Sequence, residues 1–154
     1  KEQLKLQWKA LTTATGQMSF GNPLAGPFGA TACLYDDANA LIGNLAVDNA
    51  TCGTKPCWKA KGTKGWGYQD KLASDAGISK IGFGSGVVGK GSASVQGKND
   101  AAKGLTALPP GIVGMLSGQT HPTIQLVTSG SFCVGATMTE VTKDDGLQYK
   151  ARKK

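Results

Sequence analysis

Basic and aromatic side chains gather in one short stretch of the chain, between residues 55 and 71. The stretch holds Lys55, Lys59, Lys61, Lys64 and Lys71 together with Trp58, Trp66 and Tyr68, and Asp70 is its single acid. Lysines attract anions and aromatic faces stack on rings or cations, so this mixture suits an acidic polysaccharide, another polyanion or a protein interface. The candidate binding surface is therefore Trp58, Trp66, Tyr68, Lys59, Lys61 and Lys64. In the alternative interpretation the aromatics form core and the lysines form the wet face of the same strands.

A glycine-rich stretch at residues 84–91, Gly-Ser-Gly-Val-Val-Gly-Lys-Gly, comes close to two phosphate-binding patterns. Both the P-loop and the dinucleotide fingerprint need a helix directly after the loop, because the helix N-terminus binds the phosphate. Residues 92–97 form a poor helix, and Gly91 stands where a P-loop has its metal-binding Ser or Thr. In a chain with 23 glycines such matches arise by chance, so no nucleotide cofactor is expected.

Catalytic and metal-binding patterns are equally weak. His121 is the only histidine, and Pro122 after it biases it toward an extended or turn conformation. The pairs Asp36-Asp37 and Asp144-Asp145 suit calcium in principle, but Asp in such places more often bonds its own turn. We therefore expect no catalytic residue, no metal, no other cofactor and no enzymatic activity.

Four cysteines, Cys33, Cys52, Cys57 and Cys133, make an even number. Zinc sites usually draw on CxxC-type pairs or several histidines, so two disulfides are favoured over a four-thiolate site, and they imply an oxidising compartment. Four cysteines allow three pairings. Gly53 and Pro56 can turn the chain between Cys52 and Cys57, which favours a local bridge there and leaves Cys33 for Cys133.

The formal net charge is +7, and Arg152 is the only arginine. Arg makes the bidentate contacts typical of specific nucleic-acid readers, whereas Lys is a hydrated point charge, so we expect polyanion attraction without specific nucleic-acid binding. No apolar run approaches the ~18 residues of a membrane-spanning helix, so no transmembrane segment is expected. The start at Lys1 fits a mature exported protein, and Asn49-Ala50-Thr51 is a glycosylation sequon.

Alternating apolar and polar residues predict strands along the whole chain. The expected strands span residues 4–10, 30–35, 40–47, 57–61, 66–69, 78–83, 91–97, 123–128, 132–141 and 147–152, with a further short strand near 18–20. Turn residues at 36–39 and 129–130 join two pairs of them into hairpins. The pattern predicts an all-β fold: a single antiparallel β-sandwich of about 8–10 short strands with long Gly/Pro-rich loops, one domain over residues 1–154.

Several motifs occur in an order that resembles a known family. They lie in Cys57–Lys71, Thr123–Val127, Cys133–Thr137 and Lys143–Arg152, as WKxxG followed by GWxYxDK, then PTIQL, CxxAT and YKAR. Together they resemble a β-rich domain of uncharacterised secreted bacterial proteins, over about the last two-thirds of the chain. Val134 departs from the aromatic residue expected after the cysteine. The resemblance implies export and a β fold, and no reaction.

We expect a secreted, non-enzymatic structural or cell-surface protein, with a subunit of an extracellular fibre as the leading hypothesis. Leu4, Leu6 and Trp8 line one face of an amphipathic strand that a long Gly/Pro-containing connection follows. Residues 1–12 are therefore an exchangeable N-terminal strand that can complete a neighbour's sheet and build an open homopolymer, unless they pair within their own sheet. The alternative function is a secreted binding module for acidic polysaccharide or another polyanion.

Overall fold

The computed structural model describes residues 1–48 and 51–153, most of them in strands and the turns that join them. The strands are β1 (Gln3–Lys9), β2 (Ala30–Tyr35), β3 (Leu41–Val47), β4 (Thr51–Cys52), β5 (Lys55–Pro56), β6 (Trp58–Ala60), β7 (Gly65–Gln69), β8 (Ile78–Gly84), β9 (Ser92–Lys98), β10 (Thr123–Thr128), β11 (Cys133–Thr137), β12 (Glu140–Asp144) and β13 (Gln148–Lys153). The helical segments are η1 (Gln17–Phe20), η2 (Ala101–Lys103) and α1 (Ile112–Leu116). The predicted all-β class is confirmed. The sequon at Asn49 lies outside the described residues.

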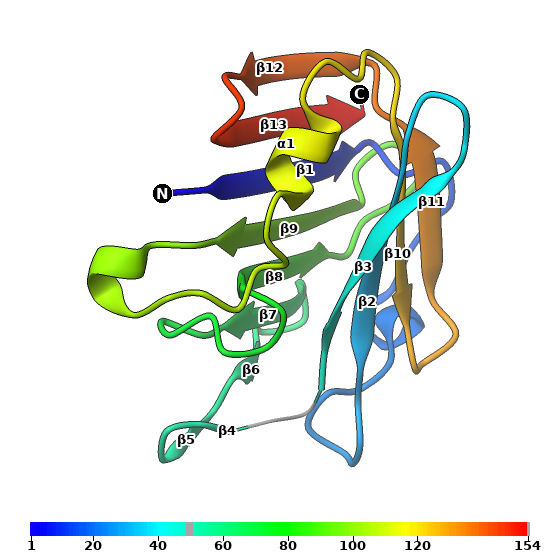
Figure 1. Ribbon diagram of the computed structural model, residues 1–154. Helices are drawn as coiled ribbons and strands as arrows, with labels where there is room; N and C mark the ends of the chain where they lie inside the picture. The colour runs from blue at the N-terminus through cyan, green and yellow to red at the C-terminus, as the bar shows by residue number, and fades with distance from the viewer. Residues whose placement is uncertain (49–50, 154) are drawn as a thin grey trace.

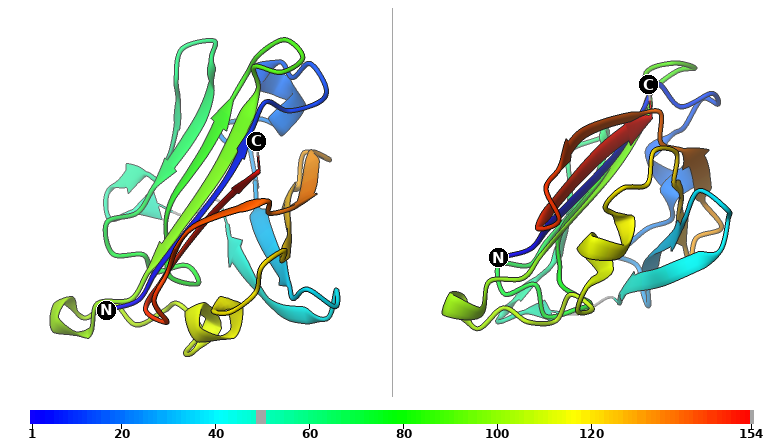
Figure 2. Two further views of the ribbon diagram at one scale, coloured as in Figure 1. Left: turned by 90° about the horizontal axis from the view of Figure 1, so that it is seen from above. Right: turned by 45° about the horizontal axis from the view of Figure 1, so that its top comes forward.

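Two sheets make up the body of the molecule. A seven-stranded sheet has the order β12-β13-β1-β9-β8-β7-β6, a four-stranded sheet has the order β11-β10-β2-β3, and β4 pairs with β5. The strands of the smaller sheet run across those of the larger one, and α1 packs against both β3 and β13 (Figures 1 and 2). The pairs are antiparallel except β1 with β13, which is parallel.

One hydrophobic core lies between the two sheets. The larger sheet contributes Leu6 and Phe83, and the smaller sheet contributes Leu34, Ile124 and Leu126, all fully buried. Such inward side chains occupy alternate positions of their strands, which is why the period-two pattern predicts the strands. The two sheets stack as a sandwich because this arrangement buries the apolar face of each sheet against the other.

The first strand occupies the interior of the larger sheet. β1 pairs with β13 on one side and with β9 on the other, and Leu4, Leu6 and Trp8 are at most 1 % exposed. The predicted amphipathic strand is thus confirmed, and it pairs within its own chain. Whether copies exchange it stays a prediction.

Two sequence expectations about elements are wrong. Residues 18–20, expected as a strand, belong to the 3-10 segment η1. Residues 132–141, expected as one strand, divide into β11 and β12, which lie in different sheets. The backbone N–H of Met138 still donates to Pro122 beside β10, whereas that of Thr139 donates to Arg152 of β13. The chain therefore changes sheets between these two residues.

The cysteines meet one expectation and contradict the other. Cys52 and Cys57 form a disulfide, with their Cα atoms 5.0 Å apart. The predicted Cys33–Cys133 bridge is wrong, because both thiols are free. Cys33 lies opposite Gln125 and Cys133 opposite Val127, so β10 separates them. Two strand spacings amount to about 10 Å, beyond the reach of a disulfide.

Gly65 begins β7 at a point where the backbone allows no side chain. Its φ is +129°, and a Cβ atom there would lie 2.0 Å from the carbonyl oxygen of Phe83. We predict that Gly65→Ala lowers the free energy of unfolding by more than about 3 kcal/mol, because the clash is with backbone. Chemical denaturation measures this.

The matched control is Gly62→Ala in the same hairpin. Gly62 also has a positive φ, +59°, but a Cβ there would meet nothing within 4 Å. Its expected cost is only the left-handed conformation of alanine, about 1 kcal/mol. Equal losses in the two variants would contradict the assignment of a backbone clash at Gly65.

Candidate functional site

The three aromatics of the predicted binding surface point into the core. Trp58, Trp66 and Tyr68 are 1 %, 4 % and 2 % exposed. Trp58 contacts the rings of Phe28, Tyr68 and Phe83. Because they are covered, they cannot stack on a ligand, and that half of the expectation is wrong. Alternation along β6 and β7 explains the result, since Trp58 and Tyr68 are register partners on the inner face.

The lysines of the same segment lie on the opposite, outward face. Lys59, Lys61 and Lys64 are exposed, as predicted for a wet face. Lys61 lies back over two neighbouring glycines: a Cβ at Gly67 would be 2.8 Å from its Cε, and one at Gly82 would be 3.3 Å from its Nζ. The missing side chains on β7 and β8 thus leave the space that the Lys61 side chain occupies.

Three hollows share residues along this outward face. One of about 230 Å³ lies over β1, β8 and β9, and one of about 450 Å³ lies over β6 to β9; both are lined by Lys61, Gly82 and Ser94. A third, of about 480 Å³, lies beside the disulfide and shares Lys59 and Gln69 with the second. We call them together the lysine groove. Its cations are Lys9, Lys55, Lys59, Lys61, Lys64, Lys71 and Lys80.

Neutral hydrogen-bonding groups lie between these cations. Ser94 is the register partner of Gln7 on β1, and Gln96 is the partner of both Lys80 and Lys5. Amides and hydroxyls supply both donors and acceptors, so the groove can meet hydroxyl groups as well as negative charge.

The cationic surface continues beyond the groove onto β13 and β12. Lys5 lies directly opposite Lys150, and Lys150 lies opposite Lys143. Lys143 pairs with Asp145, whereas neither Lys5 nor Lys150 has a salt bridge within residues 1–48 and 51–153. Like charges directly opposite each other destabilise a sheet, so this arrangement costs folding stability.

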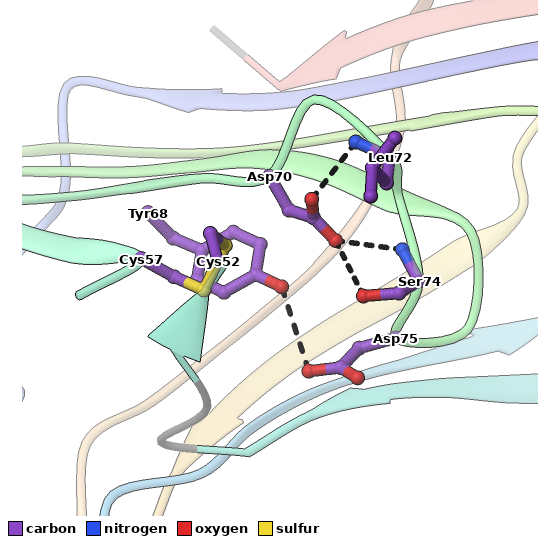
Figure 3. The surroundings of a disulfide bond; sticks show 7 residues. All are labelled: Cys52, Cys57, Tyr68, Asp70, Leu72, Ser74 and Asp75. Atoms are coloured by element: carbon purple, nitrogen blue, oxygen red, sulfur yellow. Dashed lines mark hydrogen bonds between the residues drawn. A yellow bond between two sulfur atoms is a disulfide. The ribbon is translucent and has the colours of Figure 1, made fainter. Parts of the chain in front are cut away.

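Asp70 is the one acid among the described residues that line the groove, and its oxygens are already engaged. Oδ1 accepts the backbone N–H of Leu72, and Oδ2 accepts both the N–H and the hydroxyl of Ser74 (Figure 3). Burial acts to raise the pKa of Asp70, but these hydrogen bonds outweigh it and lower the pKa below its usual 3.8. Asp70 therefore shapes the loop at 70–77 and leaves the groove positive.

Tyr68 lies on β7, two residues before Asp70, and its ring is buried beneath the groove. Its hydroxyl is 3.5 Å from Oδ2 of Asp75, a long hydrogen bond (Figure 3). Burial, together with the negative charges of Asp75 and Asp70, raises the pKa of Tyr68. The phenol consequently stays neutral at physiological pH and adds no charge to the groove.

The other motifs singled out in the sequence build turns and loops. Residues 85–91 connect β8 directly to β9, so no helix follows the glycine-rich stretch. Asp37 accepts the N–H groups of Thr120 and His121, which ties the β2–β3 turn to the segment before β10. Within the described ranges no group of three or more His, Cys, Asp or Glu side chains is placed to hold a metal ion.

Acid should remove the contribution of Asp70 to stability. Its pKa is lowered on folding, so the stabilisation is present above pH 3.8 and is lost as pH falls below that value. We predict that Asp70→Asn lowers the free energy of unfolding at pH 7 by about 1–3 kcal/mol, because Ser74 loses an acceptor. Urea unfolding at pH 7 and pH 3 should show the two proteins converging in acid; a constant difference would contradict the assignment.

No protein-family model, curated protein or solved structure matches the chain. The resemblance to secreted bacterial β domains therefore stays a prediction. Of the helices in the described residues, none is long and apolar enough to cross a membrane. The site must be interpreted from its own chemistry.

Proposed function

We propose that the protein is a non-enzymatic binding module that holds an acidic polysaccharide in the lysine groove. One observation carries the proposal: the described residues that line the three neighbouring hollows include seven lysines and a single acid. That acid, Asp70, already accepts three hydrogen bonds from its own loop. A long surface of one sign, with its opposite charge engaged, attracts an extended anion.

The groove's chemistry favours a polysaccharide over a nucleic acid. Single-stranded nucleic acids are held by exposed aromatics that stack on bases, and the aromatics beside this groove are buried. The guanidinium of Arg152 is paired with Glu140. The groove therefore offers lysine ammonium groups with Gln and Ser side chains between them. These groups match a polysaccharide that carries carboxylates or sulfates together with hydroxyl groups. Because no aromatic ring stacks on the polysaccharide, its affinity for the groove depends on charge and falls as the salt concentration rises.

The opposed lysines at Lys5 and Lys150 support the same proposal. They are register partners on the groove's face, and their repulsion weakens the sheet. A bound anion would neutralise that repulsion. Binding would then restore the folding stability that the repulsion removes from the free protein. The Cys52–Cys57 disulfide supports a location outside the cell, because such bonds persist in oxidising compartments.

Charge reversal within the groove tests this function. We predict that Lys61→Glu with Lys80→Glu weakens binding to heparin, used as the probe, by about tenfold or more. The matched control is Lys90→Glu with Lys103→Glu, which changes the net charge equally but alters no residue that lines the groove. Isothermal titration at two salt concentrations measures both.

The control decides between a site and general attraction. Equal weakening in the two double variants would mean that net charge alone holds the probe, which would overturn the groove. Absence of binding by the parent at low salt would overturn the polyanion function altogether. Single-stranded DNA, tested in parallel, should bind more weakly than heparin at equal salt.

A fibre subunit is the second candidate, and the position of β1 supports it. β1 lies inside its sheet, so a copy's strand in the same slot would make identical bonds with β9 and β13. Leu4, Leu6 and Trp8 would fill the same buried positions, since they are already at most 1 % exposed. Exchange of this kind repeats head to tail and gives an open polymer when the rotation does not close.

Removal of residues 1–12 tests the exchange. Loss of β1 would split the larger sheet, so we predict that the truncated chain folds only when a synthetic peptide of residues 1–12 is added. Circular dichroism measures the rescue, and electron microscopy of the full-length protein looks for filaments. Monodisperse monomers at all concentrations, together with a peptide that does not bind, would contradict the fibre.

A further inference from the structure

The two edges of the larger sheet are protected against pairing with other strands. β12 carries Glu140, Lys143 and Asp144, and its register with β13 is interrupted between Val141 and Lys143. β6 is only three residues long and includes Lys59. Charges, bulges and short strands are the usual means by which proteins keep sheet edges from joining.

The smaller sheet has one edge strand that carries no charge and no register shift. β11 consists of Cys133–Thr137, with no charged residue, no proline and an unbroken five-residue register against β10. The other edge, β3, has a register shift near Leu41, and Gly43 lies against Ile112 of α1. Figure 1 shows β11 at the outer side of its sheet. β11 is thus the edge of this sheet that keeps a regular register over its whole length, whereas β3 keeps it only from Gly43 to Val47.

The backbone groups on this edge alternate in direction. The carbonyl oxygen of Phe132 accepts a bond from Thr128, and the N–H of Met138 donates to Pro122, so the even-numbered residues face β10. Cys133, Gly135 and Thr137 therefore direct their N–H and C=O groups away from the sheet. All three residues are exposed, and no hydrogen bond joins their outward groups to any described residue.

We propose that β11 pairs antiparallel with β11 of a second copy of this chain, centred on Gly135, to form a two-fold dimer with one continuous eight-stranded sheet. Gly135 would then face its own counterpart, and Cys133 would face Thr137 of the second copy. In this register the outward N–H and C=O groups of each copy pair with the outward C=O and N–H groups of the other copy. Two-fold symmetry therefore satisfies all of them at once.

Charge does not prevent a second copy from pairing at this edge. The chain carries +7, so copies repel wherever their lysines face each other. The outward side chains of β2, β10 and β11 are Thr, Cys, Tyr, Gln, Val and Gly, with no charge among them. Two copies can meet along this sheet without bringing lysines together. The lysine grooves lie on the other sheet and remain open in the dimer.

The register makes a chemical prediction that distinguishes it from other contacts. Directly opposite residues in such a hydrogen-bonded pair have Cα atoms about 5.5 Å apart, within the range of a disulfide. The two Cys133 residues, by contrast, would lie four positions apart and could not join. Thr137→Cys should therefore produce a covalent dimer through Cys133, whereas the parent should not.

Oxidative cross-linking tests the dimer. Under mild oxidation, Thr137→Cys is expected to run as a dimer on a non-reducing gel, and mass spectrometry should find Cys133 linked to the thiol introduced at position 137. The control is Thr123→Cys, which places a new thiol on the same outward face but on β10, one strand from the edge. It should stay monomeric. Equal cross-linking of both variants would indicate random collision and overturn the proposal.

A second measurement does not depend on thiol chemistry. Cys133→Lys with Thr137→Lys changes two exposed side chains, so folding is preserved, but it sets lysine against lysine across the proposed pair. Sedimentation of the parent over a concentration series should show a monomer–dimer equilibrium that this variant loses. If the parent remains monomeric throughout and Thr137→Cys does not cross-link, the dimer is overturned. The edge of β11 would then be open only to a strand of another protein.

Discussion

The pairing of β1 with two neighbours is the constraint on which the larger sheet depends. β1 joins β13, at the end of the chain, to β9, in its middle, and no other described strand connects these two parts of the sheet. Its inward side chains, Leu4, Leu6 and Trp8, are also part of the core. The groove and its continuation on β13 form one surface only because β1 holds the two halves side by side.

Alternation along the strands then divides the chemistry between two faces. Inward positions of β6 and β7 place Trp58 and Tyr68 in the core, and outward positions place Lys59 and Gly67 on the surface. The same segment thus supplies both packing and charge, which is why its composition mixes aromatics with lysines. Gly67 and Gly82, beneath the Lys61 side chain, leave room for it on the outward surface.

Local pattern predicts the elements well and their long-range arrangement poorly. Period-two alternation anticipates β2 and β10 to the residue, because one face of each is buried. It cannot show that residues 132–141 change sheets, since both halves alternate, nor that β10 separates Cys33 from Cys133. The lysines were predictable as a group, and alternation alone places Lys59 and Trp58 on opposite faces of β6. Which of these two faces is buried depends on the tertiary packing of the sheets.

The two sheets differ in charge, so one face of the molecule is positive and the other is not. Lysines cover the outward face of the larger sheet, whereas the outward face of β2, β10 and β11 has none and is bordered at the β2–β3 turn by Asp36 and Asp37. Such a molecule has an electric dipole across its thickness. Near a negatively charged layer it would rotate before touching, within about a Debye length of ~10 Å, and arrive with its lysines foremost. Encounter is then oriented by the field, and chance collision geometry matters less.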